Sequence, residues 1–102
     1  MAEQQQNSLW EKCRDGRLEE VREELEAGAD PNTTGGPFNR TLLMEAAVKD
    51  HREMVSLLLS SLGIQVNAKN MFNETALHLA CFYGSVASLS KLLATPGPYY
   101  TL

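Results

Sequence analysis

Cysteine and histidine are the residue types in this chain best suited to nucleophilic or metal chemistry. The sequence holds two of each: Cys13, His51, His78 and Cys81. A nucleophilic pair needs a base beside the thiol and a third group that orients the base, and His78 has only Cys81 three residues later on its own segment. Two isolated cysteines without nearby histidine ligands do not make a zinc site. We therefore expect no catalytic residues, no metal and no cofactor.

Composition and motifs exclude several further classes of function. No phosphate-binding G-x-x-x-x-G-K, metalloprotease H-E-x-x-H or hydrolase G-x-S-x-G motif occurs in the 102 residues. Nine Lys and Arg against thirteen Asp and Glu give a net charge of -4, whereas nucleic-acid binding needs a basic face. No run of about eighteen apolar residues is present. Neither nucleic acid nor a membrane is an expected partner.

The negative charge is concentrated in the first third of the chain. Through Asn32 there are nine acidic and four basic residues, whereas from Thr33 onward five basic residues face four acidic ones. This asymmetry fits either a solvated helix face or a docking surface for a basic partner, because it acts mainly on steering and non-specific binding. Both interpretations stay open here.

A sequence pattern recurs with a spacing of 34 residues. Residues 41–47 and 75–81 both read Thr, any residue, Leu, two further residues, Ala and a small residue. Stepping back from Thr41 by the same interval reaches Asn7, so that three copies, at about 7–37, 38–71 and 72–102, cover the chain. Such a period is the signature of a repeat protein, in which each unit buries its apolar face against its neighbours.

Each copy is predicted to form two short helices. The first helices should run for about eight residues from residues 8, 42 and 76, because each of these follows a residue type whose side-chain oxygen caps helices. These caps are Asn7, Thr41 and Thr75. The second helices are expected at 17–27, 52–61 and 86–94, where apolar residues recur at helical spacing. The turns between them are marked by residues that tolerate positive φ, namely Gly16, Asp50 and Gly84.

On these residues the chain resembles the ankyrin-repeat family over nearly its whole length. The family unit is about 33 residues with a T-P-L-H-x-A signature; here residues 75–80 read T-A-L-H-L-A, and residues 28–32 read G-A-D-P-N, similar to the family's G-A-D-x-N end. Met44 and Trp10 stand in the His place, and the end of the second copy is one residue longer than usual. The resemblance implies an all-α solenoid of three helix–turn–helix units joined by irregular hairpin-like loops.

The resemblance also assigns structural roles to the cysteines and histidines. It implies that His78 hydrogen-bonds to turn backbone and that His51 serves the surface structure. Cys13 and Cys81 would hold the same place two copies apart, which in a helix stack is roughly 20 Å, far beyond the limit of about 7 Å for a disulfide. Both are expected to be small, buried thiols, in a reducing, intracellular compartment, either the cytoplasm or the nucleus.

The function implied is protein–protein recognition by a scaffold or adaptor module. In such a stack the first helices and the turns between copies form the concave side that repeat proteins use for partners, and interfaces favour aromatic residues, Met and Arg. The candidate partner-binding residues are Phe38, Arg40, Glu45, Lys49, Met71, Phe72, Leu79, Phe82 and Tyr83. The turn tip at 71–74 is the best single candidate, although Phe72 and Phe82 could instead cover neighbouring repeats.

Two other functions remain open. The last copy carries apolar residues where a terminal repeat is normally polar: Leu89, Leu92, Leu93, Tyr99 and Tyr100. The chain could therefore be part of a longer array, or this face could mediate homo-oligomer formation in a self-assembling module. A regulatory inhibitor that docks on an enzyme is the third possibility, and no sequence feature selects it.

Overall fold

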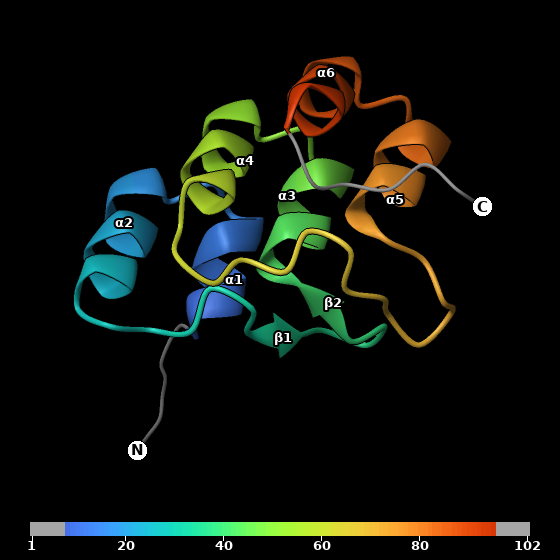
Figure 1. The fold of residues 1–102 in the computed structure, drawn as a ribbon. Coiled ribbons are helices and arrows are strands. Elements are labelled where there is room, and N and C mark those ends of the chain that lie inside the picture. The colour runs from blue at the N-terminus through green and yellow to red at the C-terminus, as the bar shows by residue number, and fades with distance from the viewer. Residues whose placement is uncertain (1–7, 96–102) are drawn as a thin grey trace.

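The computed structural model describes residues 8–95, which form three helix pairs stacked side by side (Figure 1). The pairs are α1 and α2 (Leu9–Arg14 and Leu18–Glu26), α3 and α4 (Leu42–Val48 and Arg52–Leu59), and α5 and α6 (Ala76–Tyr83 and Val86–Ala94). The helices α1, α3 and α5 form one row and α2, α4 and α6 a second, with contacts within and between pairs. The predicted all-α stack is confirmed. No helix of the described residues has the length and apolar character needed to cross a membrane.

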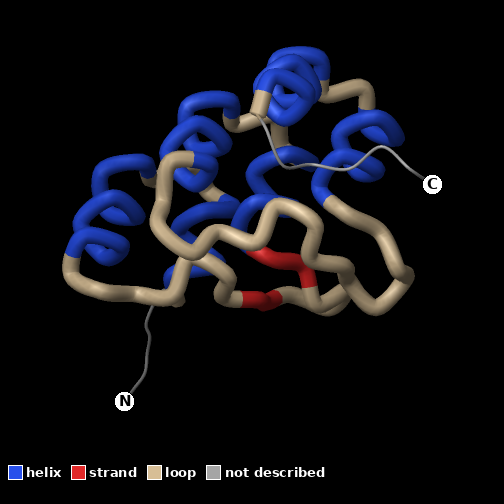
Figure 2. The backbone as a smooth tube through the Cα atoms, viewed as in Figure 1, coloured by secondary structure: helices blue, strands red, loops and turns tan. Residues whose placement is uncertain are grey.

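The segments that connect the pairs run beneath the row of first helices (Figure 2). Two short strands, β1 (Thr34–Gly35) and β2 (Arg40–Thr41), pair antiparallel with Thr34 opposite Thr41. The next connection is held to the first by Asn32, whose Nδ2 donates to the Gly63 carbonyl at 2.9 Å. Its Oδ1 accepts the N–H of Gln65 at 2.8 Å. The loops are thus ordered by specific hydrogen bonds between successive copies.

Side chains cap the first helix of every pair. The oxygens of Ser8, Thr41 and Thr75 each accept the N–H three residues later, and the residue at that third position bonds back to the cap. The caps at Thr41 and Thr75 were predicted. In the first copy the predicted cap was Asn7, which lies outside the described residues. The observed cap is Ser8, so this helix begins one residue later than predicted. The side chain that bonds back to the cap is therefore Glu11 and not Trp10.

The turns within the pairs also follow the prediction. Gly16, Asp50 and Gly84 have φ values of +77°, +56° and +68°, a region where an L residue other than Asn or Asp is strained. Asp50 contributes a second interaction, because its Oδ1 accepts both the N–H and the hydroxyl of buried Ser88 at 3.0 and 2.8 Å. Asp50 therefore forms the turn between α3 and α4 and links this pair to α6 through hydrogen bonds.

The apolar core is one continuous cluster that runs through all three pairs. Its centre is α3, in which Leu42, Leu43, Met44, Ala46 and Ala47 are all buried. This helix contacts α1 on one side and α5 on the other, so it has no solvent-facing stripe. The core therefore fills both interfaces between the three pairs, and α3 joins them into a single cluster.

One predicted buried residue is exposed. Cys13 is fully buried and its thiol donates to the Leu42 carbonyl at 3.3 Å. Cys81, one repeat beyond Ala47, is exposed because no helix pair among residues 8–95 packs on the far side of α5. The prediction that both thiols are buried was wrong for this reason. Of the apolar residues named in the last copy, Leu92 is buried and Leu93 exposed, and Tyr99 and Tyr100 lie outside the described residues.

Close helix packing makes Ala80 intolerant of a larger side chain. Ala80 is fully buried in α5, and α5 packs against both α3 and α6. Ala80→Leu should lower the free energy of unfolding by about 1–3 kcal/mol through overpacking. The measurement is urea unfolding, with Ala94→Leu at an exposed position of α6 as the control. Equal stability of the two variants would contradict the packing described for α5.

Candidate functional site

Four side chains from three separate segments converge on one face; we call them the aromatic cluster. Phe38 follows β1, Phe72 lies in the next connecting loop, Tyr83 ends α5, and Arg40 lies between them in β2. The rings of Phe38 and Phe72 lie 5.7 Å apart between centroids. The Arg40 guanidinium carbon is 5.2 Å from the centroid of Phe38 and 5.8 Å from that of Tyr83. Stacking of this kind holds an arginine and its aromatic neighbours in fixed positions.

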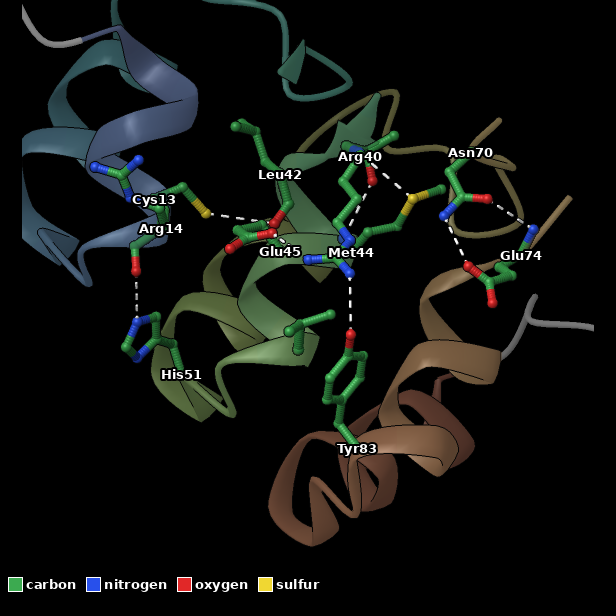
Figure 3. Close-up of polar contacts among 12 residues, drawn as sticks. Cys13, Arg14, Arg40, Leu42, Met44, Glu45, His51, Asn70, Glu74 and Tyr83 are labelled. Atoms are coloured by element: carbon green, nitrogen blue, oxygen red, sulfur yellow. Dashed lines mark hydrogen bonds and ion pairs between the residues drawn. The ribbon is translucent and has the colours of Figure 1, made fainter. Parts of the chain in front are cut away.

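Arg40 lies at the centre of this cluster, where the carboxylate of Glu45 pairs with its guanidinium group (Figure 3). One guanidinium nitrogen donates to Glu45 Oε1 at 3.1 Å, and the other donates to the Tyr83 hydroxyl at 3.3 Å. Glu45 was predicted to touch the partner directly, but it is only 2% exposed, because it lies on α3 in the middle of the stack. Its role is to position Arg40, since a buried carboxylate needs a paired cation.

The exposed members of the site are those expected at an interface. Phe38, Phe72 and Tyr83 keep 41%, 58% and 49% of their surface exposed, and Met71 keeps 61%. Phe82 is also exposed and packs edge-to-face on Tyr83 with centroids 5.0 Å apart. Phe72 is exposed and also packs on Phe38 of the preceding copy, whereas the ring contact of Phe82 is with Tyr83 of its own helix; binding of a partner by either residue stays a prediction.

Two other predicted residues lie outside the aromatic cluster. Leu79 is buried, because the inner face of α5 packs against α3, so its prediction as a surface contact was wrong. Lys49 is exposed at the C-terminal end of α3, and within residues 8–95 no hydrogen bond or ion pair joins it to the cluster. The site thus contains fewer of the predicted residues than the sequence indicated.

Asn70 shapes the loop that presents Met71 and Phe72, and sequence reasoning missed it. Its Oδ1 accepts the backbone N–H groups of Phe72 and Glu74 at 2.8 and 3.0 Å, and its Nδ2 donates to Glu74 Oε1 at 3.0 Å. The side chain is buried and replaces the backbone partners that the turn lacks. An Asn two residues before an exposed aromatic is the signal that could have revealed it.

Removing this side chain should loosen the loop. Asn70→Ala leaves two backbone N–H groups without their acceptor, so we expect the free energy of unfolding to fall by about 1–3 kcal/mol. Asn73→Gly is the matched control, because Asn73 has φ +66°, which glycine adopts freely. Chemical unfolding measures both. An Asn70→Ala protein as stable as Asn73→Gly would show that Asn70 does not organise the loop.

A pocket of about 410 Å³ adjoins the aromatic cluster between α1 and the β1–β2 hairpin. The hairpin lies directly on the Trp10 ring, since a Cβ added at Gly35 would fall 2.5 Å from Trp10 Cγ. Among the described residues two buried donors have no acceptor, Trp10 Nε1 and Arg40 Nε, and both residues line this pocket. Each unpaired buried donor lowers the stability of the fold by about 1–3 kcal/mol.

The two histidines are engaged in structural hydrogen bonds. His78 Nδ1 accepts the Thr75 N–H at 3.1 Å, as the resemblance implied. His51 Nε2 lies 2.9 Å from the Arg14 carbonyl and therefore donates to it, which links α4 to the end of α1. Within residues 8–95 no group of three or more His, Cys, Asp or Glu side chains is arranged to hold a metal ion.

The two thiols should differ sharply in reactivity. Burial, with a smaller contribution from the Glu45 charge, raises the pKa of Cys13 to about 12, whereas Cys81 is exposed. Because the thiolate is the nucleophile, a thiol reagent at mildly alkaline pH should modify Cys81 quickly and Cys13 only when the core opens, slower by about a thousandfold or more. A Cys81→Ser control should retain only the slow phase. Two equal rates would contradict the burial of Cys13.

The acidic residues of the first copy form a solvated helix face. Glu19, Glu20, Glu23 and Glu26 of α2 are exposed. Ion pairs join Arg17 to Glu20 and Lys12 to Glu24 along this face. Exposed pairs of this type contribute little to stability, and a cluster of carboxylates presents no shaped site. The interpretation as a docking surface for a basic partner therefore gains no support from the geometry.

Comparisons with known proteins fit this architecture. The family model for ankyrin repeats matches residues 9–101 as three copies. The chain is 45% identical over 75 residues to a probable E3 ubiquitin-protein ligase XBOS32 of Oryza sativa subsp. japonica, covering 71% of this chain and 14% of that protein. It is 49% identical over 72 residues to the ankyrin repeat and KH domain-containing protein mask-1 of Caenorhabditis elegans, covering 70% and 3%. It is 36% identical over 69 residues to the E3 ubiquitin-protein ligase KEG of Arabidopsis thaliana, covering 68% and 4%.

Proposed function

This chain belongs to the ankyrin-repeat family, whose repeats are in general protein–protein interaction modules, and we propose that it binds another protein through the aromatic cluster. The observation that carries the proposal is the convergence of Phe38, Arg40, Phe72 and Tyr83 from three segments onto one exposed face. Exposed apolar patches that include aromatic residues and arginine mark interaction sites. The module would act as a scaffold or adaptor.

The proposal assigns binding to this chain and no catalysis. The chain spans 14% or less of the length of each relative that it matches. Two of these relatives are named as ligases, and most of the length of each lies outside the matched segment. Their ligase activity is therefore not assigned to this chain. No contact among residues 8–95 favours an enzyme over any other protein as the partner. No observation therefore supports the alternative that the chain is a regulatory inhibitor of an enzyme.

The proposal is tested by retention of proteins from a cell extract on the immobilised chain. We expect the unaltered chain to retain a partner that a Phe72→Ala/Tyr83→Ala variant does not retain. Leu62→Ala is the matched control, because Leu62 is 95% exposed and lies outside the aromatic cluster. The partner is then purified and its 1:1 binding measured by calorimetry. Equal retention by all three proteins would overturn the proposal.

Self-assembly is a second candidate that one observation favours. Phe82, in α5, is 78% exposed and Val86, in α6, is 71% exposed, and no other helix pair among residues 8–95 follows this third pair. Face-to-face pairing of two copies would bury them. Light scattering over a concentration series measures this: a mass that rises to a dimer supports it, and a monomer at every concentration excludes it. Phe72→Ala/Tyr83→Ala should leave the mass unchanged.

We also propose that the chain works in a reducing compartment, the cytoplasm or the nucleus. Support comes from its two free cysteines, one of them exposed on α5, because exposed free thiols suit compartments in which glutathione keeps them reduced. A tagged chain should be found there by fluorescence microscopy. Its recovery from the secretory pathway would contradict this part of the proposal.

A further inference from the structure

Helix α5 exposes a histidine and a cysteine whose counterparts in the second copy are buried. His78 and Cys81 are both exposed, whereas Met44 and Ala47, which stand 34 residues earlier in the sequence, are 1% and 0% exposed. Within residues 8–95 no helix pair follows α5 and α6 to cover these two positions. Neither side chain belongs to the aromatic cluster, so the binding function proposed above leaves this pair unexplained.

The two side chains are spaced as metal ligands on one helix. Both lie within α5, and residues three apart on a helix share a face, with about 5–6 Å between their Cβ atoms. Helical side chains lean toward the N-terminus of their helix, so we expect the Cys81 thiol over the turn that carries His78. A thiolate and an imidazole are the ligands that zinc prefers.

The helix cap holds the imidazole of His78 by one nitrogen and leaves the other for a metal. Nδ1 lies 3.1 Å from the backbone nitrogen of Thr75 and 2.9 Å from its Oγ1, and among the described residues Nε2 has no hydrogen-bond partner. When Nε2 binds a metal, the ring proton moves to Nδ1 and is donated to Thr75 Oγ1, while the Thr75 N–H gives up its acceptor. Metal-bound histidines are usually oriented by such a hydrogen bond at the second nitrogen.

We propose that His78 and Cys81 of two copies of this chain together bind one zinc ion. The sequence predicted no metal because a single chain lacks a full ligand set, and within residues 8–95 no third His, Cys, Asp or Glu joins this pair. A structural zinc site needs four ligands in a tetrahedron. A two-fold axis through the metal brings the same two side chains from the second copy. The site is therefore incomplete without that copy.

The charges on the third helix pair fit a zinc ion held between two copies. Each thiol releases its proton to solvent when it binds, so two thiolates cancel the charge of Zn2+ and no net charge is buried at the metal. Between Thr75 and Thr95 the only formally charged side chain is Lys91, so the paired faces bring no carboxylates. Apolar contact is available from α6, where Leu93 is exposed and Leu89 is half-buried.

A zinc titration of the full chain, free of any polyhistidine tag and kept reduced with a phosphine, tests the proposal. We expect the mass from light scattering to double at one zinc ion per two chains and to return to that of the monomer with EDTA. Co2+ in place of zinc should give the visible bands of a tetrahedral complex and a near-ultraviolet thiolate band. A mass that does not respond to zinc, or zinc bound one-to-one by a monomer, overturns the proposal.

Two variants each remove one ligand and keep the fold. His78→Gln retains the helix cap, because glutamine takes the same position in a capping box, and Cys81→Ser alters an exposed side chain. Both should lose the zinc-dependent dimer. His51→Gln is the matched control, because its amide still offers a donor to the Arg14 carbonyl, and it should form a dimer with zinc as the unaltered chain does. A zinc-dependent dimer of either ligand variant would overturn the proposal.

Protection of Cys81 from thiol reagents separates a metal site from a disulfide. With zinc bound, the fast phase of thiol modification should disappear, and it should return with EDTA, because the metal occupies the thiolate that reacts. A dimer that EDTA leaves intact and a reductant dissociates is a disulfide, which would overturn the zinc site. The aromatic cluster is tested independently, since His78→Gln and Cys81→Ser should both still retain a partner bound there.

Discussion

Leu43→Ala should lower the free energy of unfolding by about 2–5 kcal/mol. Leu43 is 1% exposed and lies in α3, the helix that joins both interfaces of the stack. The substitution removes buried methyl groups and leaves a cavity that the surrounding helices fill only in part. A domain of this size has about 5–15 kcal/mol of stability in total, so this loss is a large share of it.

Urea unfolding followed by circular dichroism measures this effect, and Leu62→Ala serves as the matched control. It removes the same atoms from a side chain that is 95% exposed, and we expect a change within about 0.5 kcal/mol. Because α3 contacts both outer pairs, the Leu43→Ala protein should still unfold in one transition at lower urea. Similar stabilities of the two variants would contradict a core centred on α3.

Phe72→Ala should weaken partner binding by about 2 kcal/mol, which is roughly 30-fold. The ring is exposed in the free chain and would be buried in the complex, where aromatic residues contribute most of the binding energy. Stability of the free chain should change by less than about 1 kcal/mol. Calorimetry with the purified partner measures the affinity, and unchanged affinity would remove Phe72 from the interface.

A double-mutant cycle with Phe38→Ala sharpens this prediction. The rings of Phe38 and Phe72 are in contact, 5.7 Å apart between centroids, so each supports the other. The combined loss of affinity in the double variant should therefore be smaller than the sum of the single losses by about 0.5 kcal/mol or more. Simple additivity would indicate that the two rings bind independently and that the aromatic cluster does not act as a unit.

The fold was predictable from the sequence because the helix caps and turns of each repeat are formed by residues that are close together in the chain. The caps at Thr41 and Thr75 and the turns at Asp50 and Gly84 each act within a few residues and recur at a spacing of 34 residues, and the structure confirms them. Ser8 escaped prediction because α1 begins one residue late, which exact periodicity hides. The exposure of Cys81 escaped because it depends on what packs beyond α5, which no local pattern records.

The candidate site was only partly predictable for the same physical reason. Residue type and turn position pointed to Phe38, Arg40, Phe72 and Tyr83, but their convergence depends on how the hairpin, the next loop and α5 stack in three dimensions. Glu45 looked like a surface charge at helical spacing, yet the stack buries it against Arg40. Trp10 Nε1 and Arg40 Nε are buried without an acceptor among the described residues, and no sequence pattern indicates this because it depends on hydrogen-bond geometry in the folded chain.

The most direct test of the binding surface is the footprint of the bound partner on this chain. Amide hydrogen exchange is measured for the chain alone and in the complex, and the difference is mapped residue by residue. We predict protection in the β1–β2 hairpin, in the loop at 71–74 and at the end of α5 around Tyr83. Protection confined to the acidic face of α2, or to α4 and α6, would contradict binding through the aromatic cluster.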